Sequence, residues 1–533
     1  MRCEKARRGL ALITMSDTAA VRSRHERWDA MPAPAVAAML STLVVMLGWR
    51  GSDLPAQLFR ADLVRRYGFV VWNSQWYGGH PTVGYSVLSP VLGALIGPVV
   101  LGAISGLVSA ILFDRIVHRA FGRRWRLASL WFAVATVTNL IVGRVPFGVG
   151  IMLALASVFL LQRDHVVLAA GAVVLAALSS PVAALFAAIA ATAWGLAAPR
   201  RRVAAASVAA AALLPVVAIA IIFPAGGMFP YRAINLGRDV ALCALVFIVA
   251  GRARPVLRTG SAVYALVALV AFLVPTPLGG NVSRLAQYFA GPILACIVPR
   301  RLRPGLLVLA VPLLLWQWLP TFDATTSLAP DPSAAASYYQ PMVDFMATQP
   351  GEIGRVEIPF THRHWESDFA ARSVPLARGW ERQLDIEFNP SFYDGTLDAA
   401  GYQQWLADNG VRFVALPDAR LDKSSEAEAA LLATSLPYLQ EAWSDAHWRV
   451  WRVEGFAGLV SGPARLEQLD ATGFRLQVDA PGDVIVRVRP SPHWSLSTPG
   501  CVTDDGTGWT LVRAEKAGPL RVSQAVIGTG CDK

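Results

Sequence analysis

The chain has 533 residues, of which 54% are hydrophobic and 16% charged. A soluble domain carries about 25% charged residues, so this composition excludes an ordinary soluble globular protein and predicts a polytopic membrane protein. The formal net charge of +11 does not indicate a nucleic-acid partner, because the two parts of the chain carry opposite charge. Residues 1–319 hold 30 Lys/Arg and 9 Asp/Glu (net +21), whereas residues 320–533 hold 18 and 28 (net −10).

A basic segment, residues 1–30, opens the chain, and no cleavable signal peptide is evident. Eleven apolar runs follow, and we interpret them as membrane-spanning helices. The stretch 165–198 can be interpreted as two helices around Ser179–Pro181 or as one long helix. The runs cover residues 31–49, 87–113, 127–143, 147–162, 165–179, 181–198, 203–223, 239–251, 260–274, 286–299 and 304–319.

Lys and Arg cluster between these runs, and with eleven helices every cluster falls on the same side. The positive-inside rule then predicts a multi-pass protein of the cytoplasmic (inner) membrane, with its N-terminus inside and its C-terminal part outside. The clusters lie at the N-terminus, at 115–126, at Arg163 and at 200–202, 252–258 and 300–303. The loops 50–86, 144–146, 224–238 and 275–285, and the break at Ser179–Pro181, are then external.

Asp53 follows the first apolar run and is the candidate catalytic residue. In the first 319 residues it is one of three carboxylates expected to face outward near the membrane, with Asp62 and Asp239. A carboxylate at that depth is costly unless it is paired, solvated or used in a reaction. Asp53 also precedes Leu54-Pro55, a typical start of a helix, so a role as helix cap is the alternative.

Arginines recur in the external loops, where positive charge is disfavoured unless it has a partner. The guanidinium fork matches phosphate oxygens, which predicts a bound phosphate. Pairing with lipid headgroups, or with Asp62 and Asp239, is the alternative. The predicted substrate- and phosphate-binding residues are Arg60, Asp62, His80, Arg144, Arg232, Asp239 and Arg284.

Two aromatic clusters are candidate sites for binding an acceptor sugar. Trp76 and Tyr77 lie in the first external loop, and Arg378 and Trp380 lie in the segment ARGWERQLD. Anchoring at the membrane interface is the alternative for the first cluster. Packing of the C-terminal part against the membrane part is the alternative for the second.

The pattern DLPAQLFRADL…GF…W…WYGGHP…YSVLSP resembles the first external loop of GT-C-type membrane glycosyltransferases. It is most similar to bacterial and actinobacterial membrane proteins described as 6-pyruvoyl-tetrahydropterin-synthase-related. GGNVSRLAQYFAGP resembles a second recurrent segment of those proteins. The resemblance implies a GT-C-like fold for residues 31–319, a polyprenyl-phosphate sugar as donor and Asp53 at the reaction centre. The acidic pair expected of a metal-dependent member is missing at Asp53.

Three segments are predicted after the last apolar run. Residues 320–333 read as a linker, 334–455 as an external α/β domain and 456–533 as an external β-sandwich-like domain. Cys501 and Cys531 lie near turns in the last segment, and an oxidising external compartment predicts a disulfide between them.

Cofactors are not predicted. In THRHWESD, an extended backbone would place His362, His364 and Glu366 on one face as a possible metal set, but no fourth ligand is visible. The favoured function is transfer of sugar from a polyprenyl-phosphate donor to an envelope glycan or glycolipid on the external face. The alternative is a non-enzymatic transporter or scaffold for envelope polymers.

Overall fold

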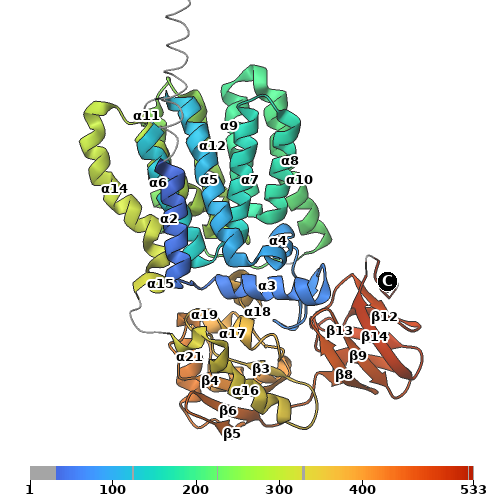
Figure 1. Ribbon diagram of the computed structural model, residues 1–533. Helices are drawn as coiled ribbons and strands as arrows, with labels where there is room; N and C mark the ends of the chain where they lie inside the picture. The colour runs from blue at the N-terminus through green and yellow to red at the C-terminus, as the bar shows by residue number, and fades with distance from the viewer. Residues whose placement is uncertain (1–31, 123–124, 225, 327–330, 526, 532–533) are drawn as a thin grey trace, which may run out of the picture.

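The computed structural model describes residues 32–122, 125–224, 226–326, 331–525 and 527–531. In these ranges the chain forms a helix bundle, with a sheet-rich C-terminal part against one end of the bundle (Figure 1). The basic segment 1–30, predicted to be cytoplasmic, lies outside the described residues.

Each of the eleven predicted apolar runs overlaps a helix of the bundle. Within the described residues, five helices are long and apolar enough to cross a membrane, as is typical of a multi-pass membrane protein. The count of eleven spans stays a prediction. The bundle helices are α2 (Pro32–Leu47), α5 (Pro98–Phe121), α6 (Trp125–Val142), α7 (Val145–Leu161), α8 (Val166–Ser179), α9 (Pro181–Ala197), α10 (Arg202–Ile222), α11 (Ala233–Ala250), α12 (Pro255–Leu273), α13 (Arg284–Ile297) and α14 (Arg303–Trp318).

One helix boundary corrects the sequence interpretation, and a second one settles an alternative that it left open. The run 87–113 is not one helix, because α4 (Leu88–Ile96) ends at Gly97, whose φ of +85° an ordinary residue rarely adopts. Pro98 then begins α5. The stretch 165–198 is two helices: Pro181 opens α9, and the Ser180 hydroxyl accepts a hydrogen bond from Ala183 N at 3.4 Å.

Two of the basic clusters contact neighbouring loops at the end of the bundle away from the C-terminal part (Figure 1). Arg201, at the start of α10, pairs with Asp164 beyond the end of α7. Arg254, before α12, donates to Ala120 O in the last turn of α5 at 3.3 Å. These contacts bring loops together that the charge pattern assigns to one side.

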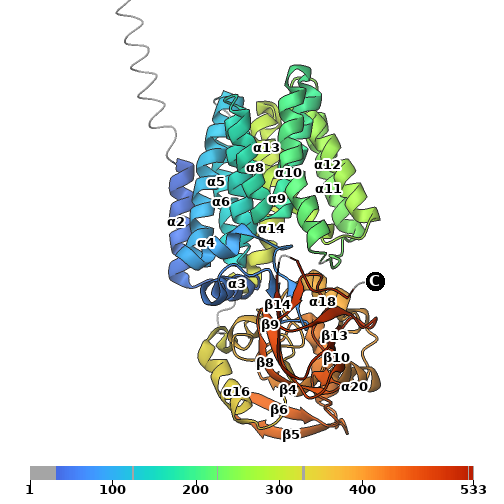
Figure 2. The same cartoon turned by 90° about the vertical axis from the view of Figure 1, so that its right-hand side faces the viewer.

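The loop 50–86, predicted to be external, lies between the bundle and the C-terminal part (Figures 1 and 2). Its helix α3 (Leu54–Tyr67) runs across the end of the bundle and is followed by the short strands β1 (Trp72–Asn73) and β2 (His80–Pro81). Trp76 and Tyr77 pack into one hydrophobic core with the α/β unit, and Trp72 packs into the core of the sandwich. The loop therefore ties both C-terminal units to the bundle.

The α/β unit has a four-stranded sheet in the order β3-β4-β6-β5. Strands β3 and β4 are parallel, and the other pairs are antiparallel. The predicted linker contains α15 (Phe322–Thr326), and residues 327–330 lie outside the described ranges. The strands are β3 (Arg355–Glu357), β4 (Val411–Pro417), β5 (Leu439–Ser444) and β6 (Trp448–Val453). The helices are α16 (Ala336–Thr348), α17 (Glu366–Phe369), α18 (Arg382–Phe388), α19 (Ser391–Asp394), α20 (Ala399–Asp408) and α21 (Glu426–Leu432).

Two four-stranded sheets follow, in the orders β12-β13-β10-β7 and β11-β14-β9-β8. Alternate residues of both sheets share one apolar core, as in a β-sandwich. A disulfide joins Cys501 to Cys531, the two residues named from the sequence. The strands are β7 (Val460–Ser461), β8 (Ala464–Asp470), β9 (Gly473–Val478), β10 (Gly482–Val486), β11 (Trp494–Leu496), β12 (Gly500–Asp504), β13 (Thr510–Ala514) and β14 (Gly518–Gln524).

Candidate active site

A cavity of about 630 Å³ lies where the bundle meets the C-terminal part. This volume is typical of a small-molecule site, for which about 300–1,000 Å³ is usual. All five segments that the charge pattern assigns to the external side contribute to its lining. They do so through Asp53 and Tyr85, Arg144, Ser180 and Pro181, Gly226 and Phe229, and Asn281 and Arg284. Trp380–Leu384 of the C-terminal part close the other side.

Asp53 is held at the cavity by its backbone. Asp53 N donates to Val142 O at 3.0 Å, and Gly51 N donates to Ile141 O at 2.7 Å. A Cβ on Gly51 would lie 2.7 Å from Ile141 O, so only glycine permits this approach to the end of α6. The Asp53 side chain makes no cap hydrogen bond to α3, so the structure does not support the helix-cap alternative.

Arg144, between α6 and α7, is the partner of Asp53. Its Nε lies 3.4 Å from Asp53 Oδ2, and both side chains are about one-fifth exposed, at 19% and 22%. Ser52 Oγ donates to the other carboxylate oxygen at 3.3 Å. One long ion contact leaves most of the acceptor capacity of the carboxylate free, since an ionised carboxylate has about four acceptor positions.

Arg284 opens α13 and lines the same cavity. Its guanidinium carbon lies 5.2 Å from the centre of the Phe147 ring. Across the described ranges, no carboxylate lies within 4.0 Å of the Arg284 guanidinium nitrogens. A half-buried arginine without an ion-pair partner is suited to bind an anionic ligand.

The remainder of the cavity is apolar. Leu213, Val216 and Ala220 lie on one face of α10, at the i, i+3, i+7 spacing of a helix. Val182 and Leu185 contribute from α9. From Leu213 to Ala220 the helix rises about 10 Å, so the cavity extends along apolar helix surface away from its charged end.

Glu381 brings a second carboxylate to the cavity from the C-terminal part. Its Oε1 lies 3.0 Å from Arg60 on α3, and both side chains are buried. Burial raises the pKa of Glu381, and Arg60 opposes that shift. His80 Nε2 lies 3.7 Å from Glu381 Oε2. Burial, with a smaller contribution from Arg60, lowers the pKa of His80 to about 3, so this imidazole is neutral at pH 7.

Trp76 and Tyr77 do not line the cavity and have no free face for a sugar. Both are buried, and Trp76 stacks on Phe59 with ring centres 4.7 Å apart. The Tyr77 hydroxyl donates to Gly379 O and accepts from Glu381 N at 2.9 Å. These two residues therefore position the cavity wall that carries Glu381. Both sequence interpretations, acceptor binding and membrane anchoring, are wrong for this pair.

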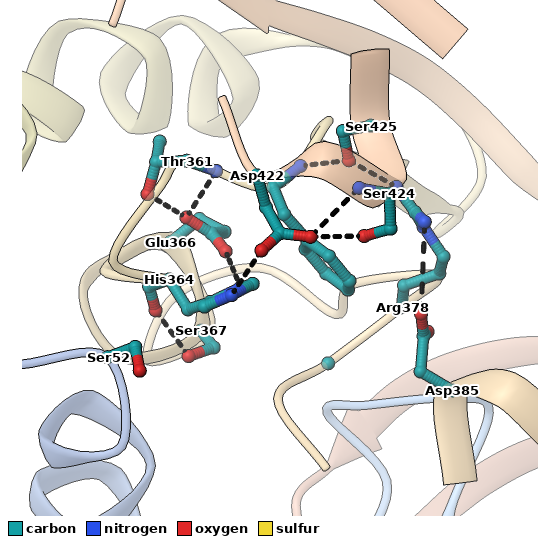
Figure 3. A network of polar contacts seen from close by, with 12 residues as sticks. Ser52, Thr361, His364, Glu366, Ser367, Arg378, Asp385, Asp422, Ser424 and Ser425 are labelled. Atoms are coloured by element: carbon teal, nitrogen blue, oxygen red, sulfur yellow. Dashed lines mark hydrogen bonds and ion pairs between the residues drawn. The ribbon is translucent and has the colours of Figure 1, made fainter. Parts of the chain in front are cut away.

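Trp380 and Arg382 lie beside Glu381 in the cavity lining. The His364 ring stacks on Trp380 with centres 3.4 Å apart, and Asp422 lies 3.0 Å from Arg382. Asp422 also lies 3.6 Å from His364 (Figure 3). This network supports the cavity wall from behind. His364 and Glu366 are not on one face of a strand as the metal hypothesis requires, because α17 begins at Glu366. The described residues contain no group of three or more His, Cys, Asp or Glu that could hold a metal ion.

Arg378 cannot contact an acceptor as the structure stands, because it is fully surrounded by protein. It pairs with Glu357 at 2.8 Å, Glu428 at 2.7 Å and Asp385 at 3.8 Å. Arg378 therefore belongs to the core of the α/β unit (Figure 3).

Five of the seven predicted substrate- and phosphate-binding residues lie outside the cavity lining. Two of them, Arg60 and His80, are buried next to Glu381. The other three lie elsewhere. Arg232 is exposed just before α11. Asp62 pairs with Arg66 at 2.7 Å and with Arg372 at 3.6 Å. Asp239 is buried on α11 and accepts hydrogen bonds from Tyr231 at 2.5 Å and from Ser283.

Glu381 and Arg382 line the cavity and belong to the segment ARGWERQLD, where they directly follow Trp380 of the predicted acceptor cluster. Tyr85 also lines the cavity but is absent from the predicted site residues. Tyr85 had a weaker signal, as an aromatic hydroxyl in the loop that also holds Asp53.

Neither a protein-family model nor a curated protein matches the chain. Among solved structures it is similar to the oligosaccharyltransferase AglB of Archaeoglobus fulgidus, in complex with an inhibitory peptide and a dolichol-phosphate. That match has 11% identity and a TM-score of 0.43, and covers 74% of this chain and 70% of AglB. It is also similar to apo ArnT from Cupriavidus metallidurans, with 15% identity, a TM-score of 0.39, and coverage of 79% and 98%. Both TM-scores are below 0.5, so neither likeness assigns a function to this chain.

Proposed function

We propose that the chain is a GT-C-type membrane glycosyltransferase. It moves a sugar from a polyprenyl-phosphate donor to a hydroxyl of an envelope glycan or glycolipid, on the external face of the cytoplasmic membrane. The observation that supports this most is one cavity that joins a carboxylate (Asp53), an arginine that forms no ion pair within the described residues (Arg284) and an apolar wall along α9 and α10.

A lipid-phosphate sugar fits these three features. Its hydrocarbon chain can lie against the apolar wall, and its phosphate, which bears one negative charge, can pair with Arg284. The acceptor binds on the side lined by the C-terminal part, where Trp380 offers an aromatic ring and Glu381 a carboxylate. The external placement is supported by the basic clusters at the other end of the bundle.

The reaction is a displacement at the anomeric carbon of the sugar. The acceptor oxygen forms a bond to that carbon, and the bond between the carbon and the phosphate oxygen breaks. The electron pair of the broken bond stays on the phosphate, whose charge grows from one to two, and the acceptor proton passes to Asp53. Proton acceptance by a positioned carboxylate contributes about 10²- to 10⁴-fold to a rate. Arg284 stabilises the charge that grows on the phosphate.

The test compares two arginines that the sequence analysis treats alike. Purified protein in lipid vesicles is given a panel of polyprenyl-phosphate sugars and an envelope extract as acceptor, and release of polyprenyl phosphate is measured. Arg284→Ala is expected to lower the rate about 100-fold or more, as loss of one transition-state charge contact does. Arg232→Ala is the matched control and is expected to keep the rate, because Arg232 is exposed outside the cavity.

Equal rates in the two variants would overturn the assignment of the phosphate to Arg284. Binding of polyprenyl phosphate by the wild type without release of sugar from any donor would instead support the transporter or scaffold alternative.

A further inference from the structure

Tyr85 is a cavity residue without a role in the reaction described above. It lies in the turn between β2 and α4 and is half-buried. The chain just after it is fixed against the end of α8: Val87 N donates to Leu178 O at 2.8 Å, and the Ser89 and Ser179 hydroxyls are 2.8 Å apart. The backbone that carries Tyr85 is therefore held in place relative to the cavity.

The ring of Tyr85 is also held. The guanidinium carbon of Arg60 lies 4.1 Å from the ring centre, which is a close cation–π contact. Arg60 in turn is buried and fixed by its 3.0 Å pair with Glu381. A phenol ring packed on a buried and paired guanidinium has little freedom to turn away from the cavity.

The hydroxyl of Tyr85, by contrast, has no hydrogen-bond partner in the part of the chain that the structure describes. It shares the cavity with Asp53, Arg284 and Glu381 and interacts electrostatically with all three. Burial, and to a smaller extent Asp53, raises the pKa of this phenol, which keeps its proton at neutral pH. The group is thus a positioned donor without an acceptor, beside the arginine suited to an anion.

We infer that Tyr85 contacts the substrate: its hydroxyl donates a hydrogen bond to the phosphate of the lipid donor, on which Arg284 also acts. This rests on the proposed function. The bond strengthens as the sugar departs, because the phosphate oxygen that keeps the electron pair becomes more negative. A donor aimed at developing charge accelerates the reaction step more than it tightens binding of the substrate.

The test uses Tyr85→Phe, which removes the hydroxyl and keeps the ring against Arg60. In the vesicle assay, kcat is expected to fall about 10- to 100-fold, the effect of losing a hydrogen bond to a charged group, with a small change in KM for the donor. Tyr67→Phe is the matched control, since Tyr67 lies at the exposed end of α3 in the same loop. It is expected to leave kcat unchanged.

A binding measurement separates this inference from the proposed function. Titration with polyprenyl phosphate is expected to show about tenfold weaker binding by Tyr85→Phe than by wild type, and equal binding of the uncharged polyprenol. Wild-type kcat and phosphate affinity in Tyr85→Phe would overturn the inference and leave the proposed function standing. A rise confined to the KM for the acceptor would also overturn it, because the hydroxyl would then serve the acceptor. Loss of the proposed function would instead appear in the wild type, as absence of sugar transfer from every donor.

Discussion

Two sets of arginine and carboxylate side chains in this protein differ in how completely protein surrounds them. Around Arg378, three carboxylates and two aromatic rings contact a buried guanidinium. At the cavity, Arg144 and Asp53 make one contact of 3.4 Å and keep about one-fifth of their surface exposed. A buried arginine whose carboxylate partners surround it has no surface left for a ligand and belongs to the core. An arginine and a carboxylate that are only partly paired beside a cavity can still bind a ligand or react.

A change at Asp53, in the pair that lines the cavity, is expected to have the largest effect on sugar transfer. Asp53→Asn should lower sugar transfer about 10²- to 10⁴-fold, because an amide cannot take the acceptor proton. The free energy of unfolding should change little, since the side chain makes no cap hydrogen bond to α3. Transfer assays and thermal unfolding in detergent measure the two quantities. Ser52→Ala, which removes a 3.3 Å contact to the same carboxylate, is the control. Full activity in Asp53→Asn would remove Asp53 from the mechanism.

The buried set is expected to show the opposite pattern. Arg378→Met would leave Glu357, Asp385 and Glu428 buried without their cation and should destabilise the α/β unit by about 3–5 kcal/mol. Chemical unfolding followed by tryptophan fluorescence measures the loss. The exposed pair of Arg465 and Asp479 provides the control, and Arg465→Met should change stability by less than about 1 kcal/mol. Similar losses in the two variants would contradict the contrast between buried and exposed pairs.

The charge pattern along the chain predicted which loops share one side, and in the structure those loops line one cavity. Clusters of Lys and Arg alternate with apolar runs, so the sidedness of each loop follows from local sequence. The cavity is lined by all five segments assigned to one side. Whether a residue of these loops faces the cavity depends on how the helices pack, and local sequence does not encode that packing. Arg232 and Arg284 therefore look equivalent in the sequence, yet Arg284 lines the cavity and Arg232 does not.

Trp76, Tyr77 and Arg378 could not be placed from sequence for a related reason. A cluster of aromatic and charged residues has the same composition at a sugar site and in a buried core. What decides between them is contact between distant parts of the chain, such as the Tyr77 hydroxyl on Gly379 O. Only glycine fits where this segment approaches the loop, because a Cβ on Gly379 would lie 2.4 Å from the Trp76 side chain. Without the tertiary partner, that constraint is not visible in the sequence.

Asp239 is an intermediate case, since it is buried like the Arg378 set but lies next to a cavity residue. It accepts a hydrogen bond from Ser283, which directly precedes Arg284. Asp239→Ala is expected to weaken binding of polyprenyl phosphate about tenfold, through a displaced Arg284. Asp239→Asn keeps an acceptor oxygen and should restore most of the affinity.

Combining Asp239→Ala with Arg284→Ala tests whether Asp239 acts by positioning Arg284 or by a separate effect on the structure. If Asp239 acts through Arg284, the double variant should bind polyprenyl phosphate no more weakly than Arg284→Ala alone. Additive losses of affinity would show that Asp239 acts independently of Arg284.

The smallest expected effect concerns His364, which links the buried network to the cavity wall. It lies between Glu366 at 3.5 Å and Asp422 at 3.6 Å, with Trp380 on its face and Phe360 at its edge. Burial lowers the pKa of His364, but the two carboxylates outweigh burial and raise it above 6.5. The folded state then binds more protons than the unfolded state above about pH 6.5, so the stabilisation is complete below that pH and is lost as pH rises through the raised pKa.

The free energy of unfolding should therefore fall more steeply between about pH 6 and pH 9 in the wild type than in His364→Gln, which has no titrating group at this position. The titration of Asp422 does not contribute to this difference. Burial raises the pKa of Asp422, but the contacts with His364 and Arg382 outweigh burial and hold that pKa below its usual range. The stabilisation by Asp422 is lost only as pH falls through that lowered pKa, well below the range tested. Unfolding midpoints of both proteins across this range measure the difference. Parallel pH profiles would show that the pKa of His364 is the same in the folded and unfolded protein, so that Glu366 and Asp422 do not favour its charged form.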